Sequence, residues 1–381
     1  MSKKKILIIS FSDLKYDGRV SRQINFLKDT YHVEVLALSN NDDQGFVFHA
    51  LEKTKLTIMR KLILALLLLL RQYKTAYWVQ YAYKSVMKKF KSQSFDLVIG
   101  NDVESLPLAF GINESNVFFD AHEYAPRHFE ERLWWRVFFR GFNVYLCRLY
   151  IPLVKGMTTV CDGLALEYQK DFNYLPDVIT NAPPFADFKI NENTSFPVKI
   201  IHHGIANASR KMENMLKIMD QLGDKYELDL MLMIPEFASG KSKKYIEEFK
   251  SEVNKRSNVK MIAPVRSDEI VDKIKKYDIG LFLLEPINFN YTNALPNKLF
   301  EFIQARLAVA IGPSPEMAKV VSAYHCGIIS ESFQPSDLAN QIRLLTHEEL
   351  STYKSNAEKA AKELNAEKNK EKLLQLIEEV I

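Results

Sequence analysis

Short apolar runs alternate with amphipathic stretches along nearly the whole chain. This alternation is typical of parallel α/β folds, in which helices join buried strands. Val20, Ile24 and Leu27 share one face of a predicted helix after the first run. Five runs in the first half of the chain are predicted strands: KILIIS, HVEVLAL, FDLVIGND, NVFFDAHE and GMTTVCD. Several of them end in polar residues, and doubly wound sheets bind ligands at the carboxyl ends of their strands.

The pattern begins again in the middle of the chain, after Pro183, Pro184 and the polar stretch 191–195. Four further strands are predicted there: VKIIHHG, ELDLMLMI, VKMIAPV and DIGLFLLE. A chain of 381 residues is also too long for one ordinary core. We therefore expect an α/β protein with two Rossmann-like domains, residues 1–188 and 189–364. A C-terminal helix over 365–381 is expected to pack back toward the first domain.

Composition excludes several classes of protein. The net charge of +4 argues against general nucleic-acid binding. The three cysteines form no CxxC pair, which argues against a disulfide framework and favours a reducing, cytoplasmic compartment. The apolar run near the N-terminus breaks at Ser12 and Asp13, too early for a signal peptide, so we interpret it as a buried strand.

The segment from Asn293 to Glu301 has the character of a phosphate-binding helix start. Pro296 suits the first turn of a helix, and Asn293 is a candidate cap. The start of such a helix offers free N–H groups and the positive end of the helix dipole to a phosphate. Lys298 adds a positive charge, and Glu301 can accept hydrogen bonds from ribose hydroxyls.

This segment resembles the donor-binding E-x7-E motif of family 4 retaining glycosyltransferases. Its Pro-Asn-Lys-Leu-Phe-Glu form is similar to the members of that family that assemble polysaccharides, and LAVAIGPSPEMAKVV resembles the strand, loop and helix that follow. Glu301 matches the second Glu, which binds the donor ribose, while Asn293 stands where the first Glu is usual. The resemblance implies a donor site formed by Asn293, Asn297, Lys298, Leu299 and Glu301.

The loop after VKIIHHG carries Gly204, Arg210 and Lys211. Gly204 permits a tight turn and close approach to the backbone. The two cations stand at the start of a helix predicted from about Lys211 to Leu222, where charge and dipole together suit a diphosphate. The loop resembles the family's diphosphate-binding loop of Gly, Arg, a spacer and Lys. Lys211 matches that Lys, and Ile205 replaces the Arg.

Candidate acceptor residues lie in the first half of the chain. Asp120, His122 and Glu123 end a predicted strand, and a His there can hydrogen-bond a sugar hydroxyl or stabilise developing charge. His122 resembles the family's strand-end His, which lies against the transferred sugar, and Asp120 and Glu123 are expected to orient it or to bind acceptor. Asp102 ends another strand and is a further acceptor candidate.

The loop after the first predicted strand contains Gly18 and Arg19. It resembles the family's Gly-containing loop that faces the donor phosphates and the acceptor. Gly18 would offer its backbone to the donor, and Arg19 would meet an anionic acceptor.

The family resemblance implies a GT-B fold, with two facing Rossmann-like domains and a deep cleft between them. The first domain would bind the acceptor and the second the nucleotide sugar, with His122, Lys211 and Glu301 as catalytic residues. The expected reaction moves a hexose-type sugar from a UDP- or GDP-sugar to a glycan or lipid-linked acceptor in bacterial surface polysaccharide assembly. It is expected to retain anomeric configuration. The chain has no Asp-x-Asp motif and no zinc-type spacing, so we expect no metal and no cofactor.

Two other functions stay open at this point. A GT-B sugar-nucleotide epimerase would need further carboxylates in the cleft as acid and base. A non-catalytic GT-B partner subunit is compatible with Asn293 and Ile205, which replace the family's usual Glu and Arg.

A strongly apolar stretch runs from Leu62 to Leu70, far short of the ~20 residues that span a bilayer. We predict a helix buried in the first domain. The alternative is an interfacial helix whose basic flanks meet an anionic membrane at the inner face of the plasma membrane, joined by the aromatic run 134–140. No acidic residue lies among the basic residues of this region: Lys53, Lys55, Arg60, Lys61, Arg71, Lys74, Lys84, Lys88, Lys89 and Lys91.

Overall fold

The computed structural model describes residues 3–40, 45–190, 196–234 and 240–381. The chain divides into two compact units. Unit 1 extends to Thr180 and also includes Asn288–Asn290 and Asn369–Ile381, and unit 2 comprises Asn181–Ile287 and Tyr291–Lys368. The polar stretch 191–195, which helped to predict a domain boundary, lies outside the described residues. The functions predicted for the two domains stay predictions.

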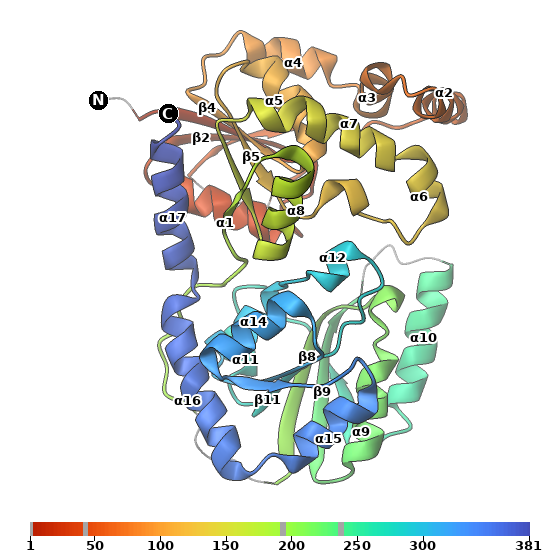
Figure 1. Cartoon of the computed structure of the whole chain (residues 1–381), viewed down its shortest axis with the longest axis vertical. Helices are drawn as coiled ribbons and strands as arrows, with labels where there is room; N and C mark the ends of the chain where they lie inside the picture. Colours follow the sequence, from red (N-terminus) through yellow and green to blue (C-terminus); the bar gives the residue numbers. More distant parts are fainter. Residues whose placement is uncertain (1–2, 41–44, 191–195, 235–239) are drawn as a thin grey trace. The chain divides into compact units, whose positions relative to one another are not determined.

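Unit 1 contains a sheet of seven strands in the order β3-β2-β1-β4-β5-β6-β7, and every pairing is parallel (Figure 1). The strands are β1 Lys5–Ile9, β2 His32–Ala37, β3 Val47–Ala50, β4 Leu97–Asn101, β5 Val117–Ala121, β6 Gly156–Thr159 and β7 Asp177–Val178. The five predicted strands are confirmed. The two that were not predicted, β3 and β7, are short and lie at the edges of the sheet. Strand order reverses between β1 and β4, the point where sheets of this kind bind ligands.

Helices connect the strands of unit 1. The predicted helix after β1 is confirmed, with Val20, Ile24 and Leu27 buried. Its first turn is fixed by Asp17, whose Oδ1 accepts a hydrogen bond from Val20 N at 3.0 Å. The α-helices of this unit are α1 Gly18–Leu27, α2 Ile58–Leu69, α3 Tyr73–Tyr81, α4 Lys84–Lys91, α5 Leu106–Ile112, α6 Leu133–Phe138, α7 Arg140–Tyr150, α8 Asp162–Phe172 and most of α17 Ala366–Glu378.

The prediction that the Leu-rich stretch forms a buried helix is wrong. The stretch is helical, as α2, but only Leu64 and Leu68 are buried. Seven large apolar side chains from Ile58 to Leu70 are exposed. The sequence could not show this, because a helix that is apolar around most of its circumference gives little periodic signal for the face it buries.

Unit 2 contains a second parallel sheet, of six strands in the order β10-β9-β8-β11-β12-β13. The strands are β8 Val198–Ile205, β9 Tyr226–Met233, β10 Val259–Ile262, β11 Ile279–Phe282, β12 Ala308–Ile311 and β13 Gly327–Ile329. All four strands predicted from apolar runs are confirmed, and β12 matches the strand expected from the family resemblance. Strand order reverses here between β8 and β11.

The α-helices of unit 2 pack around this sheet (Figure 1). They are α9 Glu213–Leu222, α10 Lys241–Val253, α11 Ile270–Ile274, α13 Asn297–Gln304, α14 Pro315–Tyr324, α15 Pro335–Leu344 and α16 His347–Glu363. The short helix α12 Phe289–Thr292 precedes α13, and its first two residues belong to unit 1.

Two predicted helix starts in this unit are wrong. Pro296 is the cap residue of α13, with an extended backbone (φ −78°, ψ 157°), so the helix begins at Asn297 and Asn293 lies before it. The proline ring fixes φ but leaves ψ free to be extended. Similarly, α9 begins at Glu213 rather than Lys211, because Lys211 has φ 44° and Arg210 ends a separate 3₁₀ turn, Ala208–Arg210.

A close contact fixes α13 against β11. A Cβ atom at Gly280 of β11 would collide with the ring of Phe302, which is fully buried. Glycine at this position therefore lets α13 lie directly on the strand. The contact matters for function, because α13 also carries Lys298 and Glu301.

We expect Gly280→Ala to destabilise the protein by about 1–3 kcal/mol through overpacking, and Phe302→Ala by about 3–5 kcal/mol through the cavity it leaves. The double variant should lose less than the sum, because the added methyl group enters the space that the ring vacates. Urea unfolding of the four proteins measures this coupling. Gly18→Ala is the control, because its Cβ would make only an ordinary 3.5 Å contact. Strict additivity would contradict the prediction.

Candidate functional site

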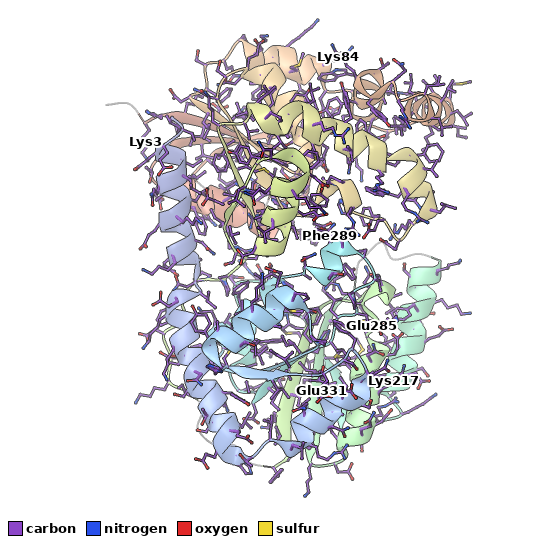
Figure 2. All side chains as sticks on the ribbon, viewed as in Figure 1. Lys3, Lys84, Lys217, Glu285, Phe289 and Glu331 are labelled. Carbon is purple, nitrogen blue, oxygen red and sulfur yellow. The ribbon has the colours of Figure 1, made fainter. Side chains whose placement is uncertain are left out.

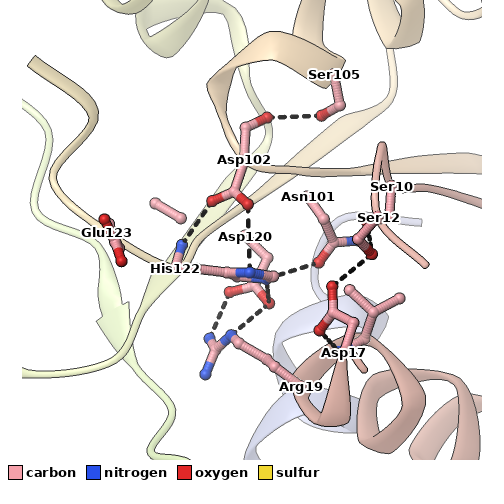
Figure 3. Close-up of polar contacts among 12 residues, drawn as sticks. Ser10, Ser12, Asp17, Arg19, Asn101, Asp102, Ser105, Asp120, His122 and Glu123 are labelled. Atoms are coloured by element: carbon pink, nitrogen blue, oxygen red, sulfur yellow. Dashed lines mark hydrogen bonds and ion pairs between the residues drawn. The ribbon is translucent and has the colours of Figure 1, made fainter. Parts of the chain in front are cut away.

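The first cluster of polar residues lies in unit 1, at the carboxyl ends of β4 and β5 (Figure 3). Asn101 and Asp102 come from the end of β4, and Asp120 and His122 from the end of β5. Arg19 reaches the cluster from the first turn of α1. The structure thus brings together four of the predicted residues: Arg19, Asp102, Asp120 and His122.

Asp120 is the centre of this cluster. It is 2% exposed, and Arg19 holds it through two hydrogen bonds, one of them from Nε to Oδ2 at 2.9 Å. Thr158 Oγ1 donates to Oδ1 at 2.7 Å, and Gln23 Nε2 donates to Oδ2 at 3.2 Å. Burial alone would raise the pKa of Asp120, but Arg19 and His122 outweigh burial and hold it well below the usual value. Asp120 is therefore a permanent negative charge inside the unit.

Arg19 is engaged inside the unit. Besides its contacts to Asp120, its Nη1 donates to the carbonyl oxygen of Ile179 at 2.8 Å. Its visible role is to compensate the buried carboxylate. Contact between Arg19 and an anionic acceptor stays a prediction.

His122 lies between two carboxylates. Its Nδ1 is 3.4 Å from Asp102 Oδ2, and its Nε2 is 3.6 Å from Asp120 Oδ2 and 3.2 Å from Asn101 Oδ1. Burial lowers the pKa of His122, but the charge of Asp102 and the hydrogen bond and charge of Asp120 prevail and raise it to about 9. At neutral pH the ring is therefore a cation that donates hydrogen bonds. Such a group can stabilise negative charge, but it cannot serve as a general base.

Asp102 has a strained backbone, with φ 60° and ψ 156°, a conformation that residues other than glycine rarely adopt. Its carbonyl oxygen accepts a hydrogen bond from Ser105 Oγ at 2.7 Å, and its Oδ1 accepts one from His122 N at 3.2 Å. Burial raises the pKa of Asp102, and burial together with the charge of Asp102 raises that of the neighbouring Glu104 to about 7. Strain and shifted carboxyl pKa values of this kind gather at functional sites.

Two other residues predicted in unit 1 lie beside this cluster. Glu123 pairs with His128 across 2.8 Å between its Oε2 and the ring Nε2. Gly18 is the first residue of α1 rather than part of the preceding loop. Glu104 and His128 were not predicted as site residues. Glu104 lies two positions beyond the strand-end Asp102, which is the only sequence signal that points to it.

The second cluster lies in unit 2, at the carboxyl end of β8, and contains three predicted donor-binding residues. Gly204 has φ 134°, which requires glycine. A Cβ atom at Gly204 would lie 3.1 Å from Lys298 Nζ and 3.6 Å from Arg210 Nη1. The backbone of the β8 loop and two cationic side chains therefore converge, as expected of an anion site.

Lys298 is buried at 4% exposure, and its Nζ has no hydrogen-bond partner among the described residues. It lies 3.9 Å above the centre of the Phe282 ring. Burial, and next the positive charge of Arg210, lower the pKa of Lys298 well below its usual value, against the attraction of Glu301. A buried amine without a hydrogen-bond partner costs folding free energy. It is also poised to bind an anion, which would supply the missing counter-charge.

Glu301 is 6% exposed and lies beside His203, with 3.4 Å between Oε2 and Nε2. Burial, and then Lys298, lower the pKa of His203 to about 3, so this ring is neutral. The pKa of its neighbour His202 is lowered well below the usual value for the same two reasons, and its Nδ1 donates to the carbonyl oxygen of Leu281 at 2.9 Å. The two histidines therefore lie near Lys298 without adding positive charge.

Lys211 takes part in a different set of contacts. It forms a salt bridge with Glu285, which also accepts a hydrogen bond from Asn214 Nδ2 at 2.9 Å. Glu285, labelled in Figure 2, follows β11 and was not predicted as a site residue, although its place just after an apolar run is a usable signal. A contact from Lys211 to a diphosphate stays a prediction.

The remaining predicted donor residues lie in α13 or just before it. Asn297 is its first residue, Asn293 lies in the turn before it, and both are half-buried. Leu299 is 1% exposed, and its N–H donates to the carbonyl oxygen of Pro296 at 3.1 Å. Its side chain therefore belongs to the core. Donor contacts of Asn293, Asn297 and Leu299 stay predictions.

No cluster of three or more His, Cys, Asp and Glu side chains suited to a metal ion occurs within residues 3–40, 45–190, 196–234 and 240–381. The expected metal independence of the reaction stays a prediction.

No model of a protein family and no curated protein matches the chain. Solved structures do match it over nearly its whole length. One from E. coli, described as trehalose-6-phosphate bound with UDP-2-fluoro glucose, has a TM-score of 0.72 at 8% identity and covers 99% of this chain and 100% of its own. Sucrose-phosphate synthase from Thermosynechococcus elongatus has a TM-score of 0.69 at 14% identity, covering 99% and 98%. WaaG, a glycosyltransferase involved in lipopolysaccharide biosynthesis, has a TM-score of 0.67 at 14% identity, covering 98% and 99%.

At these identities the likeness establishes the fold. The chain has the GT-B fold, an α/β architecture of two Rossmann-like units that each contain a parallel sheet.

We expect the His122 ring to titrate near pH 9 in NMR spectra of the ring nitrogens. Asp102→Asn should lower this pKa by about one unit or more, because it removes the largest contribution that raises it. Glu123→Gln is the matched control and should affect His128 instead. Because the pKa in the folded state exceeds 6.5, the stability that His122 contributes is complete below pH 6.5 and lost as the pH rises through 9. Wild-type titration near pH 6.5 would contradict the prediction.

Two buried lysines of unit 2 should respond oppositely to removal of their charge. Lys298→Met should stabilise the ligand-free protein by about 1–4 kcal/mol, because the amine has no hydrogen-bond partner among the described residues. Lys354→Met should destabilise it by about 3–5 kcal/mol, because Lys354 Nζ is 2.9 Å from Asp278, which would stay buried and charged.

Urea unfolding at neutral pH measures both effects. The folded-state pKa of Lys298 lies below 10.5, so the wild type should become more stable as the pH rises toward that value, and the advantage of Lys298→Met should shrink. Destabilisation by Lys298→Met would mean that the amine is compensated in the folded protein.

Proposed function

We propose that the protein is a glycosyltransferase that moves a hexose-type sugar from a UDP- or GDP-sugar to a glycan or lipid-linked acceptor. The proposed setting is bacterial surface polysaccharide assembly, in the cytoplasm at the inner face of the plasma membrane. The observation that carries the proposal is the convergence of Gly204, Arg210 and Lys298 in unit 2, within a fold shared with a protein that binds UDP-2-fluoro glucose.

The cluster in unit 2 suits a nucleoside diphosphate. Lys298 and Arg210 would neutralise the diphosphate, and the close approach of the Gly204 backbone leaves room for its oxygens. Binding would give the buried amine of Lys298 its missing partner, so the cost of burying it would be recovered in the complex. Glu301 would accept hydrogen bonds from the ribose hydroxyls, as the family resemblance implies.

The cluster in unit 1 suits the acceptor and the transferred sugar. His122 carries a positive charge at neutral pH, held by Asp102 and Asp120, and would stabilise a negative charge that develops during the reaction. Stabilisation of the departing diphosphate by fixed positive charges needs no metal ion. We therefore propose a metal-independent reaction. Retention of anomeric configuration is proposed on the family resemblance.

Thermal-shift measurements with UDP, GDP and pyrophosphate distinguish diphosphate binding from ribose binding in the donor site. UDP or GDP at about a hundred times its dissociation constant should stabilise the wild type by roughly 2.7 kcal/mol. Lys298→Met should abolish the shift with both the nucleotide and inorganic pyrophosphate. Glu301→Gln should lose the nucleotide shift but keep that of pyrophosphate, because the carboxylate meets only the ribose. Lys217→Met, at an exposed lysine of the same unit, is the control and should behave as the wild type.

Turnover separates a transferase from a non-catalytic partner subunit. Release of UDP or GDP from the matching nucleotide sugar should fall about 100-fold or more in His122→Ala, while nucleotide binding persists. Binding without turnover in the wild type, across UDP- and GDP-hexoses with added acceptors, would favour the partner subunit. No nucleotide shift at all would overturn the proposal.

A further inference from the structure

The exposed apolar side chains of α2 lie on one face of the helix. At 100° per residue, they fall within an arc of about 140°. The two buried residues, Leu64 and Leu68, lie on the opposite side. The helix therefore packs on the protein with one apolar face and presents another to the outside. The side chains that form the outer face are Ile58 at 79% exposure, Met59, Leu62, Ile63, Leu66, Leu69 and Leu70.

A neighbouring helix extends this surface. Helix α6 packs against α2 and exposes Leu133, Trp134 and Val137, each more than half exposed. Together the α2 face and these three residues, here called the α2–α6 surface, include nearly half of the large exposed hydrophobic side chains in the described part of the chain. Soluble monomers rarely keep so many apolar side chains in one exposed patch without a partner.

The length of α2 limits what that partner can be. The helix has 12 residues, against the ~20 that span a bilayer. No helix in the described ranges combines the length and apolar character needed to cross a membrane. An apolar face of this length suits a helix that lies in the plane of a membrane surface.

The basic residues around α2 favour a membrane over a protein as the partner of this surface. Arg60 and Lys61 lie on either side of the apolar arc, and Arg71 and Lys74 follow the helix. From Lys53 to Lys91 the chain has ten basic residues and no acidic one, ending with α4, where Lys84 is labelled in Figure 2. An apolar face with a basic border matches the surface of an anionic bilayer. The leucines can insert among the lipid chains, and the lysines and arginines can pair with the anionic headgroups.

The tryptophans support the same partner. Of the chain's three tryptophans, Trp134 on α6 is exposed and Trp78 on α3 is partly exposed, while Trp135 is buried, and both helices pack against α2. Tryptophan is enriched at membrane–water interfaces, where its ring sits at the level of the headgroups.

We infer that the α2–α6 surface binds the surface of a bilayer that contains anionic phospholipid, with α2 lying in the plane of the interface. The inference adds a docking surface to the proposed function, because a lipid-linked acceptor would be met at that membrane. Only the link to a lipid-linked acceptor rests on the proposed function. Vesicle binding can be measured without turnover, so either proposal can fail while the other holds.

Co-sedimentation of the whole protein with vesicles tests the inference. Vesicles of phosphatidylcholine and phosphatidylglycerol should bind the protein at least about tenfold more tightly than phosphatidylcholine alone, and raised salt should weaken the binding. Trp fluorescence should shift to the blue on binding. Leu62→Glu/Leu66→Glu should weaken binding about tenfold or more, and should fold normally because both side chains are exposed.

The matched control is Leu166→Glu/Leu175→Glu, which adds the same charges at two exposed leucines of unit 1 outside the α2–α6 surface. It should bind vesicles almost as the wild type does. Lys61→Glu/Lys74→Glu should lose most of its preference for anionic vesicles. The inference is overturned if the wild type ignores anionic vesicles at low salt, or if the control loses binding as much as Leu62→Glu/Leu66→Glu. It is also overturned if sedimentation velocity shows that this surface instead joins two copies of the chain and vesicles do not compete.

Discussion

Both sheets are entirely parallel, so all the strands of a unit end at one edge. Parallel strands are buried on both faces, which leaves polar side chains few places except the ends of the strands. Where the strand order reverses, the two neighbouring loops diverge and backbone groups become accessible to a ligand. In unit 1 this position holds Asp102, and in unit 2 it holds Gly204. Each lies beside a side chain with a strongly shifted pKa, His122 in one unit and Lys298 in the other.

The two clusters differ in how their buried charges are compensated. Asp120 is surrounded by hydrogen-bond donors from Arg19, Gln23 and Thr158, so the charge in unit 1 is satisfied within the protein. In unit 2, Lys354 is satisfied by Asp278, but the amine of Lys298 donates no hydrogen bond to any described residue and lies near Arg210. A buried amine with a shifted pKa and no hydrogen bond is well placed to bind a ligand of opposite charge. This difference, more than either motif, is why we place the anionic part of the substrate in unit 2.

The sequence predicted the long elements with a strong hydrophobic pattern. Its predictions were wrong where a single residue is compatible with several backbone conformations. The nine strands predicted from apolar runs are present, while the edge strands β3, β7 and β13 were not predicted. The prediction of Asn293 as a cap depends on Pro296 lying inside the helix, but proline leaves ψ undetermined and Pro296 is itself the cap. The strand-end position predicts His122 as a site residue and the motif predicts Lys298, and both stay predictions. The salt bridge between Lys211 and Glu285 joins residues far apart in the chain, so only the fold could reveal it.

Helix α2 shows the limit of sequence patterns most clearly. Periodicity locates a buried face by contrast with a polar one, and α2 has apolar residues around most of its circumference. The local sequence therefore fits a core helix as well as a helix at a membrane surface. Only the packing of unit 1, which buries Leu64 and Leu68 and leaves Leu62 and Leu66 exposed, distinguishes the two. The basic residues Arg60 and Lys61, on either side of the exposed face, carry the distinction further. A core helix would gain nothing from them, and the segment from Lys53 to Lys91 has ten basic residues and no acidic one.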